Sequence, residues 1–128
     1  MGYQSFKELR VWQEAKGLAV DVYTTTAQGN LSRDYGLKDQ MQRAAVSIAS
    51  NIAEGYERNS DKEFIRFLMI AKGSISELRT QLEIAKDINY VAQEKFDPLE
   101  EKCNKIGSML TKLIVARRGD SESRKIGE

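Results

Sequence analysis

Residues 60–85 read SDKEFIRFLMIAKGSISELRTQLEIA, and the apolar positions of this stretch recur at alternating steps of four and three. This period places them in one seam along one side of an α-helix. The seam consists of Phe64, Leu68, Ala71, Ile75, Leu78, Leu82 and Ala85. Ser60 and Glu63 precede it with the spacing of a capping box, so we predict a long amphipathic helix that starts at Ser60.

Two stretches before this helix have the same kind of spacing. We expect the first helix to start at Ser5, where Ser5 and Glu8 form another capping box, and to end near residues 28–30. We expect the second to run from about Leu37 to Gly55, with Gly55 as its stop. Their inward-facing positions are Leu9, Trp12, Ala15, Ala19 and Val22 in the first, and Leu37, Met41, Ala44, Ile48 and Ile52 in the second.

The last expected helix opens at Asp97. Pro98 would then stand in the first turn, where its missing N–H is harmless, and Glu100 would complete the cap. After Arg118 the run GDSES offers nothing to bury, so we expect residues 119–128 to form a disordered tail. The inward-facing positions of this helix are Leu99, Ile106, Leu110 and Leu113.

Short connections between consecutive long helices force antiparallel neighbours. The sequence therefore predicts one all-α domain, residues 1–118, folded as an antiparallel up-down-up-down four-helix bundle with crossings of roughly 20°. Gly17, Gly73 and Gly107 lie inside the expected helices, at a cost of about 1 kcal/mol each relative to alanine. Either another backbone passes close to these glycines, or the bundle tolerates them.

Composition limits the chemistry open to the chain. Its 128 residues include no histidine, the commonest general base and zinc ligand, and no glycine-rich phosphate loop. Cys103 is the single cysteine, and we interpret it as a small core hydrophobe. Neighbouring carboxylates, Glu100 with Glu101 and Glu54 with Glu57, could hold a cation, but surface charge is the simpler interpretation. We predict a protein that is not an enzyme and has neither metal nor cofactor.

The location also follows from composition. No apolar run approaches the roughly 20 residues of a membrane-spanning helix, and the opening MGYQS lacks a signal pattern. Hydrophobic residues make up 41% of the chain and charged residues 30%, a globular balance. We expect a cytoplasmic protein with no membrane partner.

Positive charge gathers in the last helix, although the net charge of the chain is only +1. Such a row would contact phosphates rather than bases, which predicts a nucleic-acid-binding surface. The alternative is an ordinary solvated helix whose cations stabilise the negative end of its dipole. The candidate residues, in a stretch without any acid, are Lys102, Lys105, Lys112, Arg117 and Arg118.

A second apolar stripe lies on the third helix, about 120° from its seam, and consists of Ile70, Ile84 and Ile88. It could pack on a neighbouring helix of the same bundle, or it could form a subunit interface.

The outer face of the second helix carries a polar row without lysine: Gln40, Arg43, Ser47, Ser50, Asn51 and Glu54. This row is either solvated or in contact with another subunit or a ligand, and we favour contact. An ion pair between Arg43 and Glu77 is a further hypothesis. The predicted subunit interface comprises Arg43, Ser47, Asn51, Glu54, Ile70, Glu77, Ile84 and Ile88.

Several motifs on the second and third helices resemble those of a bacterial family, the four-helix bundle proteins encoded within intervening sequences of 23S ribosomal RNA genes. The resemblance covers about residues 6–115. One departure is visible in the first loop, where Gly29-Asn30-Leu31-Ser32-Arg33 replaces a Phe-Pro and acidic residues. The matching motifs are Tyr35-Gly36-Leu37, Asn51-Ile52-Ala53-Glu54-Gly55, Glu63-Phe64-Ile65-Arg66-Phe67-Leu68, Gly73-Ser74 and Glu77-Leu78.

The resemblance implies a left-handed four-helix bundle that assembles into a homopentamer. It also implies a distant similarity to the accessory protein of diversity-generating retroelements, which binds nucleic acid and a reverse transcriptase. We therefore expect a non-enzymatic homopentameric scaffold whose basic surfaces bind RNA or DNA. The alternative is a protein-interaction module that binds no nucleic acid, in which the polar row and the acidic third helix recognise a protein partner.

Overall fold

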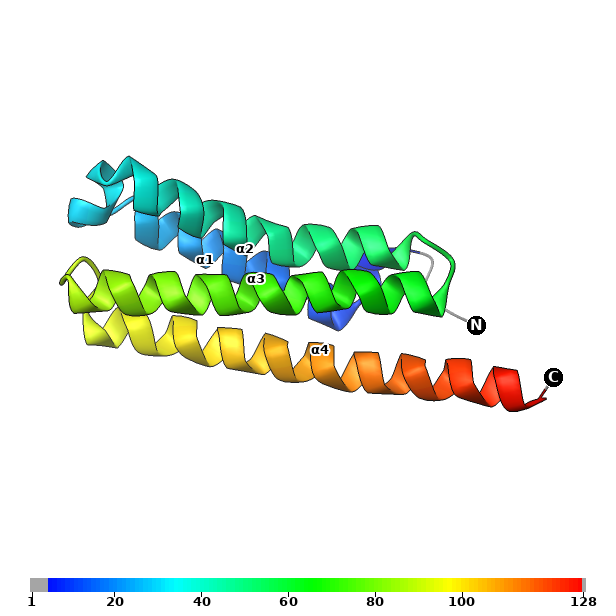
Figure 1. Cartoon of the computed structure of the whole chain (residues 1–128). Helices are drawn as coiled ribbons and strands as arrows, with labels where there is room; N and C mark the ends of the chain where they lie inside the picture. Colours follow the sequence, from blue (N-terminus) through cyan, green and yellow to red (C-terminus); the bar gives the residue numbers. More distant parts are fainter. Residues whose placement is uncertain (1–4, 128) are drawn as a thin grey trace.

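A computed structural model describes residues 5–127 of the chain, with side chains for residues 5–120. Four α-helices and no strand among the described residues confirm the predicted all-α four-helix bundle (Figure 1). The elements in chain order are the 3-10 turn η1 (Phe6–Glu8), α1 (Arg10–Thr26), the 3-10 turn η2 (Gly29–Arg33), α2 (Tyr35–Tyr56), α3 (Asp61–Asp87) and α4 (Gln93–Gly127).

Neighbouring helices run in opposite directions, because residue numbers that rise along one helix meet numbers that fall along the other. Helix α1 is thus opposed to α4, α4 to α3, and α3 to α2, so α1 and α2 are also antiparallel. The handedness of the bundle stays a prediction. The contacting pairs are Glu14–Lys105 and Asp21–Lys102 for α1 and α4, Lys72–Thr111 and Arg79–Glu100 for α3 and α4, and Ser47–Ser74 and Gly55–Phe67 for α2 and α3.

Helix α3 forms as its sequence predicts. The Ser60 hydroxyl accepts a hydrogen bond from the Glu63 backbone N–H at 3.1 Å, which satisfies one of the free donors of the first turn. All seven positions of the predicted seam are buried in the core that the four helices share. This helix therefore fixes one wall of the bundle.

The first helix starts later than predicted. Ser5 caps only the 3-10 turn η1, accepting from the Lys7 backbone N–H at 3.2 Å, and α1 begins at Arg10 after an extended Leu9. The Phe6 ring packs edge-on against Trp12 with centroids 5.2 Å apart, which holds η1 against the side of α1. The buried stripe shifts accordingly: Trp12 and Ala19 are only half-buried, and the core positions are Leu9, Val11, Ala15, Leu18 and Val22.

Helix α2 starts at Tyr35, where the Asp34 carboxylate accepts from the Leu37 backbone N–H at 3.1 Å, and it ends at Tyr56. The prediction that Gly55 stops this helix is wrong. Gly55 is helical and buried, and the chain reverses instead at Asn59, whose φ of 57° is left-handed. A Cβ on Gly55 would lie 2.7 Å from the Phe67 Cβ, so the missing side chain lets α2 and α3 approach closely.

Helix α4 extends beyond its predicted limits at both ends. It starts at Gln93 and includes Pro98, because the earlier start buries Phe96. Glu100 does not cap it; its carboxylate binds Arg79 of α3 at 2.6 Å. Of the predicted inward positions, Leu99, Ile106 and Leu110 are buried, Leu113 is half-buried, and Ile114 takes the last core position.

The helical backbone of α4 continues past Arg118 to Gly127, where the sequence predicts disorder. These residues extend an existing helix, so no new helix has to be nucleated and each residue adds one backbone hydrogen bond. Gly119 within this stretch costs only about 1 kcal/mol. In Figure 1 this part of α4 projects past the start of α3. Residue 128 lies outside the described residues.

Two further observations complete the fold. Among the described residues, a Cβ built on Gly17, Gly73 or Gly107 would meet no atom of another element within 4 Å, so no neighbouring described backbone passes close to these glycines. Over the described residues, no helix combines the length and the apolar character needed to cross a membrane.

Candidate functional site

The second apolar stripe, on α3 and the residue that follows it, is only partly covered within the chain. Ile70, Ile84 and Ile88 are 41%, 47% and 47% exposed, and Met69 next to Ile70 is 49% exposed. The rest of the bundle therefore covers about half of each isoleucine and leaves the other half open to a partner. The chain leaves four large apolar side chains on the outside of one helix, a surface that an apolar partner would cover.

Two members of the polar row on α2, Ser47 and Asn51, form hydrogen bonds within the chain. The Ser74 hydroxyl donates to the Ser47 hydroxyl at 2.9 Å, and the Asn51 amide donates to both the Ser47 hydroxyl and its carbonyl. Both residues are only half-exposed. The Ser74–Ser47 hydrogen bond thus joins α3 to α2, and Asn51 binds Ser47 within α2.

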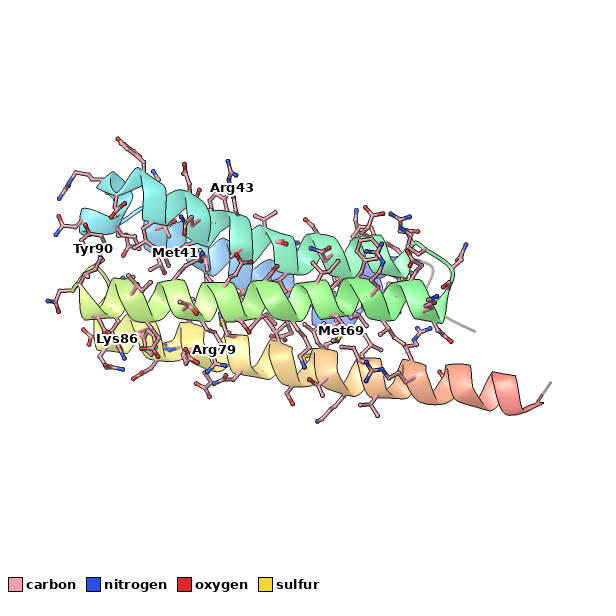
Figure 2. All side chains as sticks on the ribbon, viewed as in Figure 1. Met41, Arg43, Met69, Arg79, Lys86 and Tyr90 are labelled. Carbon is pink, nitrogen blue, oxygen red and sulfur yellow. The ribbon has the colours of Figure 1, made fainter. Side chains whose placement is uncertain are left out.

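The outermost residues of the polar row, Arg43 and Glu54, are exposed. Glu54 pairs with Arg58 one turn later at 3.2 Å. The predicted ion pair between Arg43 and Glu77 is wrong, since neither belongs to any ion pair among the residues with described side chains. Arg43 projects from the outer side of α2 (Figure 2), and α3 turns Ser74, not Glu77, toward α2. Both charges remain exposed on the surface.

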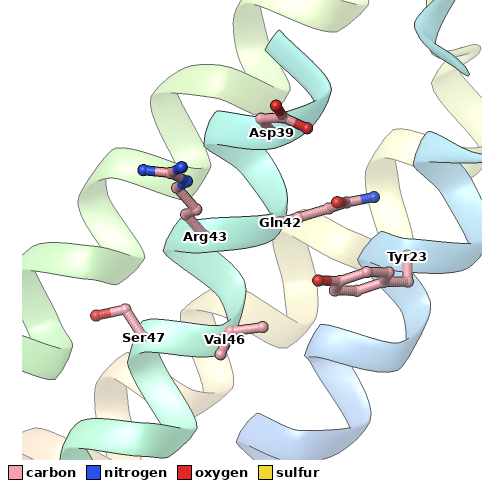
Figure 3. A pocket seen from close by; sticks show the side chains of 6 residues that line it. All are labelled: Tyr23, Asp39, Gln42, Arg43, Val46 and Ser47. Carbon is pink, nitrogen blue, oxygen red and sulfur yellow. The ribbon is translucent and has the colours of Figure 1, made fainter. Parts of the chain in front are cut away.

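A shallow groove of about 530 Å³ lies on the outer side of α2, next to α1 (Figure 3). Tyr23 of α1 and Val46 of α2 form its exposed apolar part. The Gln42 side-chain amide donates a hydrogen bond to the Thr26 hydroxyl at 3.0 Å, which fixes its position. The groove is lined by Tyr23, Asp39, Gln42, Arg43, Val46 and Ser47.

Most of the predicted basic stripe on α4 is neutralised within the chain. Lys102 forms an ion pair with Asp21 of α1, and Lys105 pairs with Glu14 of α1 at 3.3 Å. Arg117 reaches the largely buried Asp61 at the start of α3 at 3.2 Å. Over residues 5–120, the two remaining candidates, Lys112 and Arg118, are exposed and belong to no ion pair. Sequence spacing along one helix could not reveal these partners, because they lie on other helices.

Possible metal ligands are also taken up or scattered. Glu100 binds Arg79 and Glu54 binds Arg58, so neither of the carboxylate pairs noted in the sequence is free as a pair. Within the described part of the chain, no three cysteine, aspartate or glutamate residues gather into a group that could hold an ion.

Cys103 is buried, and burial raises the pKa of its thiol from 9.0 to about 12, with the charge of Glu100 adding to the effect. We expect its reaction with a thiol reagent at pH 8 to be at least about a thousandfold slower in the folded protein than after unfolding. Because the folded pKa is the higher one, the neutral thiol stabilises the fold fully below pH 9 and this contribution is lost as the pH rises toward 12. Equal rates with and without denaturant would contradict the buried placement.

The 23S rRNA-intervening sequence protein family matches residues 7–112. The chain belongs to this family. The resemblance read from the sequence, over about residues 6–115, is thereby confirmed. The chain is also similar to the crystal structure of a protein of unknown function from the S23 ribosomal protein family of Bacteroides thetaiotaomicron, with a TM-score of 0.75 and 24% identity over 81% of this chain and 97% of that one. At this identity the similarity shows a common fold. No curated protein matches the chain.

Some motif residues of this 23S rRNA-intervening sequence protein hold α2 against α3. Ser74 of α3 donates a hydrogen bond to Ser47 of α2, and Gly55 lets Phe67 approach. These motif residues are thus explained by packing between two helices. They leave the outer face of α3 and the end of α4 as the candidate functional surfaces.

Proposed function

We propose that this member of the 23S rRNA-intervening sequence protein family is a non-enzymatic scaffold in the cytoplasm, assembled from copies of itself. The observation that carries the proposal is the exposed stripe of Ile70, Ile84 and Ile88 on α3. Five copies is the number that the family resemblance implies. The assembly presents its remaining basic surfaces to nucleic acid.

The energetics favour covering this stripe. Full burial of an isoleucine side chain is worth about 1.5–3 kcal/mol, so covering the exposed half of each is worth on the order of 1 kcal/mol. Gly73 lies among these residues with open space beside its backbone, so a second helix could approach closely there. Arg43 and Glu77 are opposite charges on the neighbouring surface and could pair between copies.

Two features support a scaffold rather than an enzyme. The chain has no histidine, and its single thiol is buried with a pKa raised to about 12, far above the range in which it would act as a nucleophile. In each of the two carboxylate pairs noted in the sequence, one member is bound by an arginine. The described surface is therefore better suited to binding a partner through apolar and charged contacts than to catalysis.

Solution mass by light scattering tests the proposal, at two salt concentrations and with and without a mixed RNA sample. We expect a mass near five times the 14.5 kDa chain, increasing with RNA only at low salt, because phosphate binding weakens steeply with ionic strength. A stable assembly indifferent to RNA at both concentrations would favour a protein-interaction module. A monomer indifferent to RNA would overturn both the assembly and the nucleic-acid surface.

A further inference from the structure

The positive charge of α4 is cancelled along its middle. Lys102 and Lys105 each face an acid of α1, and on the opposite side Glu100 faces Arg79 of α3. Each of these partly exposed pairs has no net charge, so a phosphate approaching Lys102 or Lys105 also meets a carboxylate. The middle of the helix therefore has little free charge for a polyanion.

Cations without an acidic partner collect where α1 starts. Because Lys105 lies opposite Glu14, and the two helices are antiparallel, Lys112 lies two turns further along α4, level with the turn that leads into α1. Lys7 lies in that turn, and Arg10 is the first residue of α1. All three cations are exposed, and none is in an ion pair with any side chain described in the structure.

A second group of cations lies on the other flank of α4. The ion pair between Arg117 and Asp61 brings the end of the bundle portion of α4 to the start of α3. Arg118 and Lys62 follow these two residues in the chain, and both are exposed without an ion pair in the described set. Val115, 61% exposed, also lies on this last stretch of α4.

The acids at this end are fewer and partly engaged. Asp61 binds Arg117, and Glu63 binds Arg66 at 3.2 Å. The pKa of the Glu63 carboxyl is lowered, first by the hydrogen bond from Arg66 and further by the charges of Arg66, Arg58 and Lys62, as expected in a positive field. Glu54 binds Arg58 at 3.2 Å. Among the residues with described side chains, the other exposed acids at this end are Glu8, Glu57 and Asp120.

We propose that the phosphate backbone of a nucleic acid binds at this basic end, defined as Lys7, Arg10, Lys62, Lys112 and Arg118, and not along the middle of α4. The inference rests on the proposed function and names the surface that carries it. Lys7 of η1 and Arg10 of α1 lie on the flank of α4 that faces α1, and Lys62 lies on the flank that faces α3. A single strand crossing the end of α4 would therefore meet cations on both sides. Lysine and arginine contacts to phosphate read no base sequence, so RNA and DNA of equal length bind alike.

Two double variants with the same change in net charge separate the two surfaces. Lys112→Glu with Arg118→Glu removes two cations of the basic end, and Lys102→Glu with Lys105→Glu removes two that are already paired. Fluorescence anisotropy with labelled oligouridylate and oligothymidylate, at about 0.15 M salt, measures Kd. At this ionic strength exposed charges beyond roughly 8 Å are screened, so the readout is local.

We expect the basic-end variant to raise Kd at least tenfold for both oligonucleotides, about the effect of two lost phosphate contacts, and to reduce the slope of log Kd against log salt by roughly 1.4. We expect the paired-lysine variant to change Kd less than about threefold while lowering Tm, because it places new carboxylates against Asp21 and Glu14. Equal weakening by both variants would overturn the assignment, and so would a loss confined to the paired-lysine variant.

Light scattering of the same samples distinguishes the two proposals. A wild-type protein that assembles but binds neither oligonucleotide, even at low salt, overturns the basic end and leaves the scaffold standing. If the basic-end variant does not fold, judged by circular dichroism, the milder pair Lys112→Gln with Arg118→Gln replaces it. An unchanged Kd in that pair would also overturn the inference.

Discussion

Replacing Ile84 with aspartate is expected to reduce the assembly to species of lower mass while the helix content stays unchanged. Ile84 is 47% exposed on the outer face of α3 and takes no part in the core, so the fold of the single chain does not depend on it. Surface substitutions of this kind usually change stability by less than about 0.5 kcal/mol. A carboxylate buried between subunits without a partner costs several kcal/mol, enough to lower association a thousandfold or more.

The matched control for this variant is Val20→Asp on α1. Val20 is 56% exposed, comparable to Ile84, and carries the same kind of apolar side chain on a different helix. Light scattering at several concentrations should show dissociation for Ile84→Asp and an unchanged mass for Val20→Asp. If Val20→Asp dissociates the protein and Ile84→Asp does not, the copies meet through another face. If both remain assembled, the stripe on α3 has no role in assembly.

The features that local spacing determines could be predicted from the sequence. The seam from Phe64 to Ala85 is buried throughout, and Ser60 caps α3, because a period of 3.5 residues and a capping box both act within a single helix. The family followed from motifs whose spacing was also local. The fold class and the family can therefore be predicted from the sequence alone.

The ends of the helices are harder to predict from the sequence, because tertiary contacts override local start signals. Ser5 offers a good cap, but the contact of Phe6 with Trp12 fixes a 3-10 turn there, and α1 starts only at Arg10. Pro98 marks a favourable start for α4, yet burial of Phe96 outweighs it and the helix begins at Gln93. In both places an aromatic side chain that packs against another part of the fold decided the outcome.

The candidate sites depend on which residues of different helices lie opposite each other, and spacing within one helix does not contain that information. Lys102 and Lys105 were predicted as free cations and face Asp21 and Glu14. Spacing within one helix also does not show that Lys7 and Arg10 lie at the same end of the bundle as Lys112, because this follows from the antiparallel packing of α1 and α4. The residues of the candidate ligand surface could therefore be identified only from the structure, whereas the existence of the four helices could be predicted from the sequence.

Replacing Gly55 with alanine is expected to destabilise the bundle, although alanine is the better helix former by about 1 kcal/mol. The added Cβ would lie 2.7 Å from the Phe67 Cβ, 3.0 Å from the Phe64 ring and 3.3 Å from the Phe64 carbonyl oxygen. A ring can rotate, but the Cβ of Phe67 and the carbonyl of Phe64 move only with the backbone. Helices α2 and α3 must then separate, and overpacking of this kind costs typically 1–3 kcal/mol.

Gly17→Ala is the matched control, because a Cβ at Gly17 would meet no atom within 4 Å. The same substitution should therefore stabilise the protein by up to about 1 kcal/mol on α1 and destabilise it on α2. Thermal unfolding at one fixed protein concentration measures both, since assembly makes Tm depend on concentration. We expect Tm to fall by roughly 5–10 °C for Gly55→Ala and to rise by a few degrees for Gly17→Ala. A rise in both would mean that α2 and α3 are not held at this close approach, and the motif would then need another explanation.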